Sequence, residues 1–225
     1  MCVVDYSQLD SVQRSHADRY FSEMVFPALT PLAFDPGRPF PHMSNLSLNL
    51  AVLLRADKGT EHFARVKVPT ILPQLVPVTP VLSEAVTGKR TTPGPQYMVW
   101  LEQLIAANLQ SLFPGMEILE AHPFHITRDA DRAIQELEAD DLMESVEEGV
   151  WERRFADVVR LEVNEDMPPG ILEILQKNLE VGPEDVYPLG QPLALSRLKH
   201  LYAADYPELK DKPFVPVVPT ALRCV

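Results

Sequence analysis

Alternation of apolar and polar residues predicts a pair of strands in the first third of the chain. Apolar side chains occupy every second position from Leu46 to Leu54, which is the period of a half-buried strand. A turn is expected at 57–59, and the alternation returns from His62 to Val68. The second strand has Phe63, Arg65 and Lys67 on one face. We therefore expect an antiparallel hairpin over residues 46–68.

The stretch from Ala121 to Val163 carries a second pattern, in which strand and helix periods follow one another. Phe124 and Ile126 alternate with polar residues, and so does the run from Val158 to Val163. Between these runs, apolar residues recur at helical spacing opposite an acidic face, at Leu142, Met143, Val146 and Val150. The pattern predicts a strand–helix–strand unit in which Val158–Val163 is an interior strand and Leu161 is buried.

Helical spacing predicts four more helices. They cover Ser7–Phe26, Tyr97–Phe113, a segment from Pro168 to Gly182, and Leu193–Tyr202. In the first, Ser7 is the expected N-cap, Pro27 is the expected stop, and the expected buried stripe is Leu9, Val12, His16, Tyr20 and Met24.

Together these elements predict an α+β fold, with a mixed, partly antiparallel sheet flanked by helices. Leu72–Val78 is a candidate edge strand, because its prolines cannot donate to a central ladder. We expect residues 1–26 to lead into one main domain at 27–212, followed by a proline-rich connector at 213–225 toward further domains.

The charge balance narrows the possible partners. The 225 residues include 20 Lys and Arg against 32 Asp and Glu, a net charge of −12. Such a surface repels polyanions, so nucleic-acid binding is not expected, and any phosphate contact would need a local basic cluster. We see no apolar run long enough for a transmembrane helix and no signal peptide, which favours a cytoplasmic protein.

The chain offers little for catalysis or metal binding. Its histidines are His16, His42, His62, His122, His125 and His200. Only His122 and His125 lie close together, and on a strand they would point to opposite faces. Cys2 and Cys224 are remote in sequence, and no glycine-rich phosphate loop is present. We expect no catalytic residue, no metal site and no cofactor of this chain's own.

Four arginines are the candidate phosphate-facing or interdomain residues: Arg128, Arg153, Arg154 and Arg160. Arg128 stands at the end of a predicted strand and Arg160 within one. The competing interpretation is that they form ion pairs with neighbouring carboxylates, namely Asp129, Asp131 or Glu162.

Several passages resemble bacterial polyphosphate kinases and occur in that family's order. They are Val25–Leu32, Pro39–Pro41, Ser47–Leu50, Phe124–Asp131, Asp140–Leu142, Val159–Val163, Ile171–Leu175 and Asp185–Tyr187. The resemblance extends from about Tyr20 to about Val218, nearly the whole chain. One departure is His125, where members of the family often carry Arg or Lys.

The resemblance implies a role without catalysis. Polyphosphate kinases transfer the terminal phosphate of ATP to polyphosphate through a phosphorylated histidine, which lies in a His-x-Lys setting in their C-terminal domains. None of the six histidines here is followed two residues later by Lys. The chain therefore resembles the family's head, or middle, domain, which helps to form the nucleotide tunnel and dimer contacts. ATP and magnesium are implied for the full-length enzyme only.

The partners expected on this basis are the remaining polyphosphate kinase domains, with homo-oligomers at full length. For this chain alone, binding of ATP or polyphosphate is expected to be weak or absent. The alternative hypothesis is a stand-alone binding module for phosphohistidine or another anionic ligand.

Overall fold

The computed structural model describes residues 1–34, 40–56, 59–78, 96–129, 156–190, 192–203, 206–212, 214 and 216. The strands in this part of the chain are β1 (Cys2–Val3), β2 (Leu32–Phe34), β3 (Leu48–Arg55), β4 (Glu61–Lys67), β5 (Leu75–Pro77), β6 (Tyr97–Trp100), β7 (Glu117–Arg128), β8 (Val158–Asn164) and β9 (Val186–Leu189). The α-helices are α1 (Ser11–Tyr20), α3 (Leu101–Ala107) and α5 (Pro169–Leu179). A π-helical turn, η2 (Phe21–Val25), continues α1, and the 3-10 helices are η1 (Tyr6–Gln8), η3 (Phe26–Ala28), η4 (Leu109–Ser111), η5 (Pro183–Asp185), η6 (Leu195–Ala203) and η7 (Pro207–Leu209).

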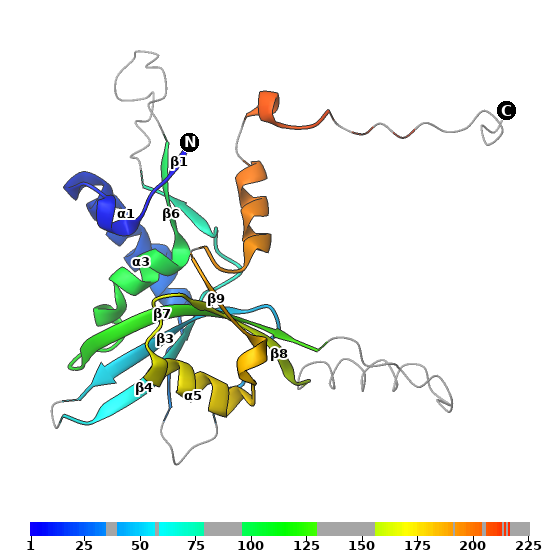
Figure 1. Cartoon of the computed structure of the whole chain (residues 1–225). Coiled ribbons are helices and arrows are strands. Elements are labelled where there is room, and N and C mark those ends of the chain that lie inside the picture. Colours follow the sequence, from blue (N-terminus) through cyan, green and yellow to red (C-terminus); the bar gives the residue numbers. More distant parts are fainter. Residues whose placement is uncertain are drawn as a thin grey trace, which may run out of the picture.

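Six strands form the main sheet, in the order β2-β4-β3-β7-β8-β9 (Figure 1). Neighbouring strands are antiparallel except β8 and β9, which run parallel. β3 and β4 pair Asn49 with Lys67 and Val52 with Ala64, which confirms the predicted hairpin. The mixed sheet with helices beside it also confirms the α+β class.

β8 lies in the interior of the main sheet, as predicted, between β7 and β9. Leu161 pairs with Ile126 on β7 and is fully buried. A bulge shifts the register between Thr127 and Arg128, so that Arg128 pairs with Val158 instead of Val159. Val159 is consequently 45% exposed, although strict alternation would place it on Leu161's buried face.

Two apolar cores lie on the two faces of the main sheet. Alternate side chains of β3 and β4, such as Leu50 and Val66, pack with residues of α1, η2 and α3. On the opposite face, side chains such as Phe124 of β7 and Leu161 of β8 pack with residues of α5 such as Leu175. Figure 1 shows α5 on one side of the sheet and α3 on the other. The sheet is thus the middle layer, and most side chains of its inner strands are buried on both faces.

A second sheet of three strands, in the order β1-β6-β5, forms beside the first. β5 is an edge strand, as its prolines predicted, and pairs antiparallel with β6. β1 pairs parallel with β6, joining Cys2 to Tyr97. The prediction of a continuous helix over Tyr97–Phe113 is therefore wrong at its start, because pairing on both edges holds 97–100 extended and α3 begins only at Leu101.

The first helix begins later than predicted. Its N-cap is Asp10, not Ser7: the Asp10 carboxylate accepts hydrogen bonds from the backbone N–H groups of Val12 (2.9 Å) and Gln13 (2.8 Å). Oε1 of Gln13 accepts from the N–H of Asp10 at 3.1 Å, which completes a capping box. Pro27 is not an abrupt stop, since it lies inside η3.

The predicted buried stripe of this segment is confirmed at Leu9, which is 5% exposed, and is wrong at Val12 and Met24, while His16 and Tyr20 are half-buried. Val12 is 63% exposed and Met24 is 53% exposed, and the buried positions are instead Ala17, Phe21 and Val25. Two apolar stripes share the same spacing in this segment. The stripe that includes Phe21 buries the larger side chain against the sheet, and it is the one that faces the core.

Replacing Asp10 by Ala should lower the free energy of unfolding by about 1 kcal/mol, because two backbone N–H groups lose their acceptor. The exposed Ser7 provides the control. Urea denaturation of Asp10→Ala and Ser7→Ala should show a lower midpoint for the first alone. A larger loss in Ser7→Ala would contradict this N-cap assignment.

The remaining predicted elements have mixed outcomes. The segment opening at Pro168 is helical but ends at Leu179, where Glu180 adopts a left-handed conformation (φ 57°), rather than near Gly182. The helix predicted at 193–202 is a 3-10 helix that begins at Leu195. The acidic helix predicted between β7 and β8, the turn residues 57–58 and most of the connector at 213–225 lie outside the described residues. No described helix has the length and apolar character needed to cross a membrane.

Candidate functional site: a cationic pocket on the main sheet

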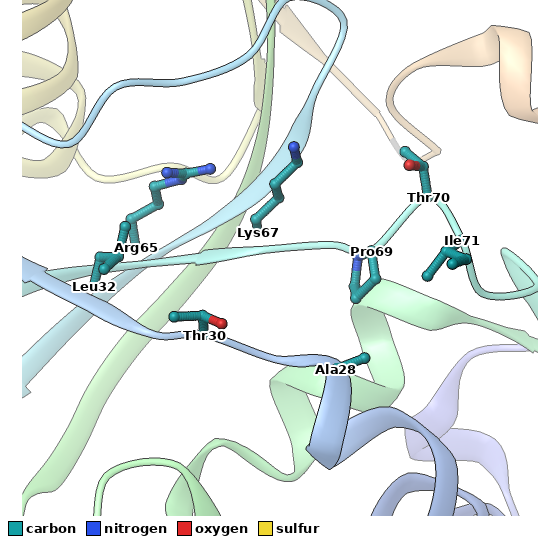
Figure 2. A pocket seen from close by; sticks show the side chains of 8 residues that line it. All are labelled: Ala28, Thr30, Leu32, Arg65, Lys67, Pro69, Thr70 and Ile71. Atoms are coloured by element: carbon teal, nitrogen blue, oxygen red, sulfur yellow. The ribbon is translucent and has the colours of Figure 1, made fainter.

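A cavity of about 390 Å³ opens where β4 leaves the main sheet. Arg65 and Lys67 of β4 line it, together with Thr30, Leu32, Pro69 and Thr70 from the adjoining segments. Figure 2 shows both basic side chains projecting from the same side of the strand. This arrangement follows from the strand period, because residues two apart point to the same face.

The guanidinium of Arg65 is held by neutral acceptors. Its Nε donates to Oδ1 of Asn49 at 2.9 Å, and its Nη1 donates to the carbonyl oxygen of His42 at 3.1 Å. Asn49 is fully buried and is fixed in turn by hydrogen bonds from its Nδ2 to the carbonyl and hydroxyl oxygens of Ser47. Arg65 is only 5% exposed, and burial lowers its pKa from the usual value.

Lys67 supplies the second cation of the pocket and is partly exposed. Its Nζ donates to the hydroxyl oxygen of Ser44 at 3.0 Å. Among the described residues, no carboxylate lines the pocket and none forms an ion pair with Arg65 or Lys67. In a chain of net charge −12, the pocket is a local concentration of positive charge.

A second set of polar contacts surrounds Glu162, on the other face of the sheet. Oε1 of Glu162 forms an ion pair with Nη2 of Arg160 at 2.9 Å, and its Oε2 accepts from the N–H of Ala194 at 3.1 Å. Nδ1 of His125 lies 3.3 Å from the same Oε2, but the contact lacks hydrogen-bond geometry. Burial lowers the pKa of His125, although Glu162 acts in the opposite direction. These contacts favour the ion-pair interpretation of Arg160.

A buried ion pair lies between η6 and α3. Nη1 and Nη2 of Arg197 donate to the two carboxylate oxygens of Glu102, each at 2.7 Å. Arg197 is 9% exposed and Glu102 is 3% exposed. The guanidinium also stacks over Trp100, 4.7 Å from the ring centroid. These contacts join η6 to α3 and, through Trp100, to β6 of the second sheet.

Arg128 uses its side chain to connect backbone segments. Its Nε donates to the carbonyl oxygen of Met43 at 2.8 Å, and its Nη1 donates to that of Ala156 at 2.5 Å. Burial lowers the pKa of this guanidinium, and nearby Asp157 opposes the shift. These contacts join the C-terminal end of β7 to the backbone at Met43 and Ala156.

A family model described as polyphosphate kinase middle domain matches residues 12–201. The chain belongs to the polyphosphate kinase family. Polyphosphate kinases of Aphanizomenon baltica and Mycobacterium tuberculosis are 45% and 46% identical to it, over 99% and 95% of its length. The chain spans 57% of the length of the first relative and 29% of the second.

The fold has a counterpart among polyphosphate kinases of known structure. The crystal structure of polyphosphate kinase from Porphyromonas gingivalis matches 97% of this chain and 30% of that protein, with a TM-score of 0.68. The two sequences are 20% identical, so this likeness concerns the fold alone. The resemblance inferred from the sequence motifs is confirmed.

Two of the four candidate arginines lie in the described part of the chain. Arg128 and Arg160 lie on adjacent strands, but each contacts its own set of partners, and Arg153 and Arg154 lie outside the described residues. In the described part of the chain, no cluster of His, Cys, Asp or Glu is arranged to hold a metal. The sequence analysis placed Arg65 and Lys67 on one face but assigned them no role. The available signal was Asn49, a polar residue facing them from the predicted partner strand.

Proposed function

We propose that this chain acts as the non-catalytic head domain of a polyphosphate kinase. The supporting observation is the family match over residues 12–201, combined with the absence of His-x-Lys from the 225-residue sequence. Covalent phosphoryl transfer needs an activated acceptor side chain, and here that acceptor would be supplied from outside these residues. The overall reaction would convert ATP and polyphosphate into ADP and a polyphosphate one unit longer.

In this proposal the domain forms part of the wall of the nucleotide tunnel and contributes contacts between subunits. Its partners are the other polyphosphate kinase domains and, at full length, a second copy of the same protein in the cytoplasm. ATP and magnesium would be bound mainly by those other domains. The rigid middle sheet, buried on both faces, suits a positioning role.

We expect no phosphorylation of the isolated chain by ATP. Incubation with γ-labelled ATP and magnesium should leave it unlabelled, while a full-length polyphosphate kinase treated in parallel becomes labelled. Acid-labile label on any of the six histidines would contradict a non-catalytic role.

A chimera tests whether the chain can act as a head domain. In the chimera, this chain replaces the matching segment of the Mycobacterium tuberculosis relative, which is 46% identical. A folded chimera that makes no polyphosphate would oppose the head-domain assignment.

A stand-alone module for an anionic ligand is the second candidate function. The presence of both Arg65 and Lys67 in a pocket whose described lining residues include no carboxylate favours it. The two functions are compatible, because a head domain can itself bind an anion.

A further inference from the structure

The positive charge of Arg65 is not balanced by a carboxylate among the described residues. Buried arginines are usually paired with a carboxylate, because desolvation of a lone cation is unfavourable. Arg197 follows this rule through Glu102. Arg65 is 5% exposed, less than Arg197, yet its hydrogen bonds within the described residues go only to neutral oxygens. An anion from outside the chain would supply the missing negative charge.

Arg65 and Lys67 line the same cavity, and each has donors that no described residue uses. Arginine carries five N–H donors, and the two hydrogen bonds of Arg65 use Nε and Nη1, so Nη2 makes none to a described residue. Lysine carries three donors, of which the contact with Ser44 uses one. Thr30 and Thr70, two exposed residues with hydroxyl groups, also line the cavity.

We propose that the Arg65–Lys67 cavity binds a phosphate-type oxyanion, either a single phosphate group or the end of a phosphate chain. The preformed Arg65 fork would hold two oxygens of the tetrahedral group, and Lys67 would supply a second positive charge. Asn49 and the His42 carbonyl fix the guanidinium before the ligand arrives, which limits the entropy lost on binding. This site needs no other domain; the inference goes beyond the proposed positioning role and rests on the second candidate function, the binding of an anionic ligand.

The lining of the cavity argues for phosphate rather than for a nucleoside base. The described residues that line it have aliphatic, hydroxyl and cationic side chains, and none of them has an aromatic ring on which a base could stack. A second cavity, of about 460 Å³, shows the opposite character, since Asp5, Glu165 and Asp166 line it. The acidic field of the whole chain opposes a polyanion, so we expect modest affinity that falls as salt rises.

Calorimetric titration of the 225-residue chain at low ionic strength tests the assignment. The probes are orthophosphate, tripolyphosphate, ATP and adenosine. Tripolyphosphate and ATP should bind with similar affinity, orthophosphate should bind more weakly, and adenosine should not bind. In amide NMR spectra, the shifts caused by tripolyphosphate should centre on Lys67 and Thr70. Binding by ATP that adenosine competes away would mean that the base is recognised, and would overturn the proposal.

Matched variants separate this site from the average charge of the chain. Arg65→Met and Lys67→Met should each weaken tripolyphosphate binding by about tenfold or more, the loss expected for a charge-assisted hydrogen bond. Arg19→Met and Lys177→Met remove one charge each from exposed positions outside the cavity and should leave the affinity nearly unchanged. Lys67 is only partly buried, so its variant remains decisive even if Arg65→Met does not fold. No binding by the parent chain, or equal loss in all four variants, would overturn the proposal.

Discussion

Replacing Arg197 by Met should lower the free energy of unfolding by about 3–5 kcal/mol. The change leaves the carboxylate of Glu102 buried without the guanidinium that meets both of its oxygens at 2.7 Å. An unpaired charge at a position only 3% exposed is strongly destabilising. A loss of this size is a large share of a domain's total stability, so the urea midpoint should move far toward zero.

A double variant identifies the cause of that loss. Arg197→Met combined with Glu102→Leu removes both charges and should recover much of the stability, because an apolar pair can replace a buried ion pair. Arg55→Met is the surface control: Arg55 pairs with Glu61 and Glu117 in solvent, and its loss should have little effect. If the double variant is no more stable than Arg197→Met, the stacking over Trp100 rather than the ion pair holds this region together.

Leu161→Ala should destabilise the fold by about 2–5 kcal/mol. Leu161 is fully buried on an interior strand, between Ile126 of β7 and Val186 of β9, and packs in the core that α5 covers. Truncation leaves a cavity where three elements meet, and the middle strand of a sheet cannot easily shift to fill it.

The bulge in β8 provides the control for Leu161. Val159 precedes it by two residues but is 45% exposed, so Val159→Ala should have a much smaller effect. Equilibrium denaturation of the two variants compares them directly. Similar losses from both would show that the register shift at Thr127 and Arg128 is absent in solution.

Local sequence patterns predicted the fold correctly where the structure depends on a single interaction. The β3–β4 hairpin and the burial of Leu161 follow from strand alternation alone. The pattern failed at Tyr97–Trp100, where helical spacing is present but strands on both edges impose an extended chain. It also failed at Val159. A bulge changes the face of the sheet on which a residue lies, and the apolar–polar pattern does not reveal it.

The polar sites were harder to predict, because their partners are distant in sequence. Glu102 and Arg197 are 95 positions apart, and nothing near either residue indicates the other. Arg65 and Lys67 are close together, but their importance depends on the absence of a nearby carboxylate among the described residues, which only the assembled pocket reveals. Arg160 was the favourable case, since its partner Glu162 is two residues away.

The two sheets differ in the chain entropy that their formation removes. The β3–β4 hairpin closes a short loop between Arg55 and Glu61, whereas β1 meets β6 only when Cys2 reaches Tyr97. Loop-closure entropy grows with the logarithm of loop length, by about 0.6 kcal/mol for each doubling. The pairing of β1 with β6 therefore loses the least chain entropy when α1 and the β3–β4 hairpin have already ordered the chain between them. Topology thus favours early formation of the local β3–β4 hairpin and late addition of β1 to the small sheet.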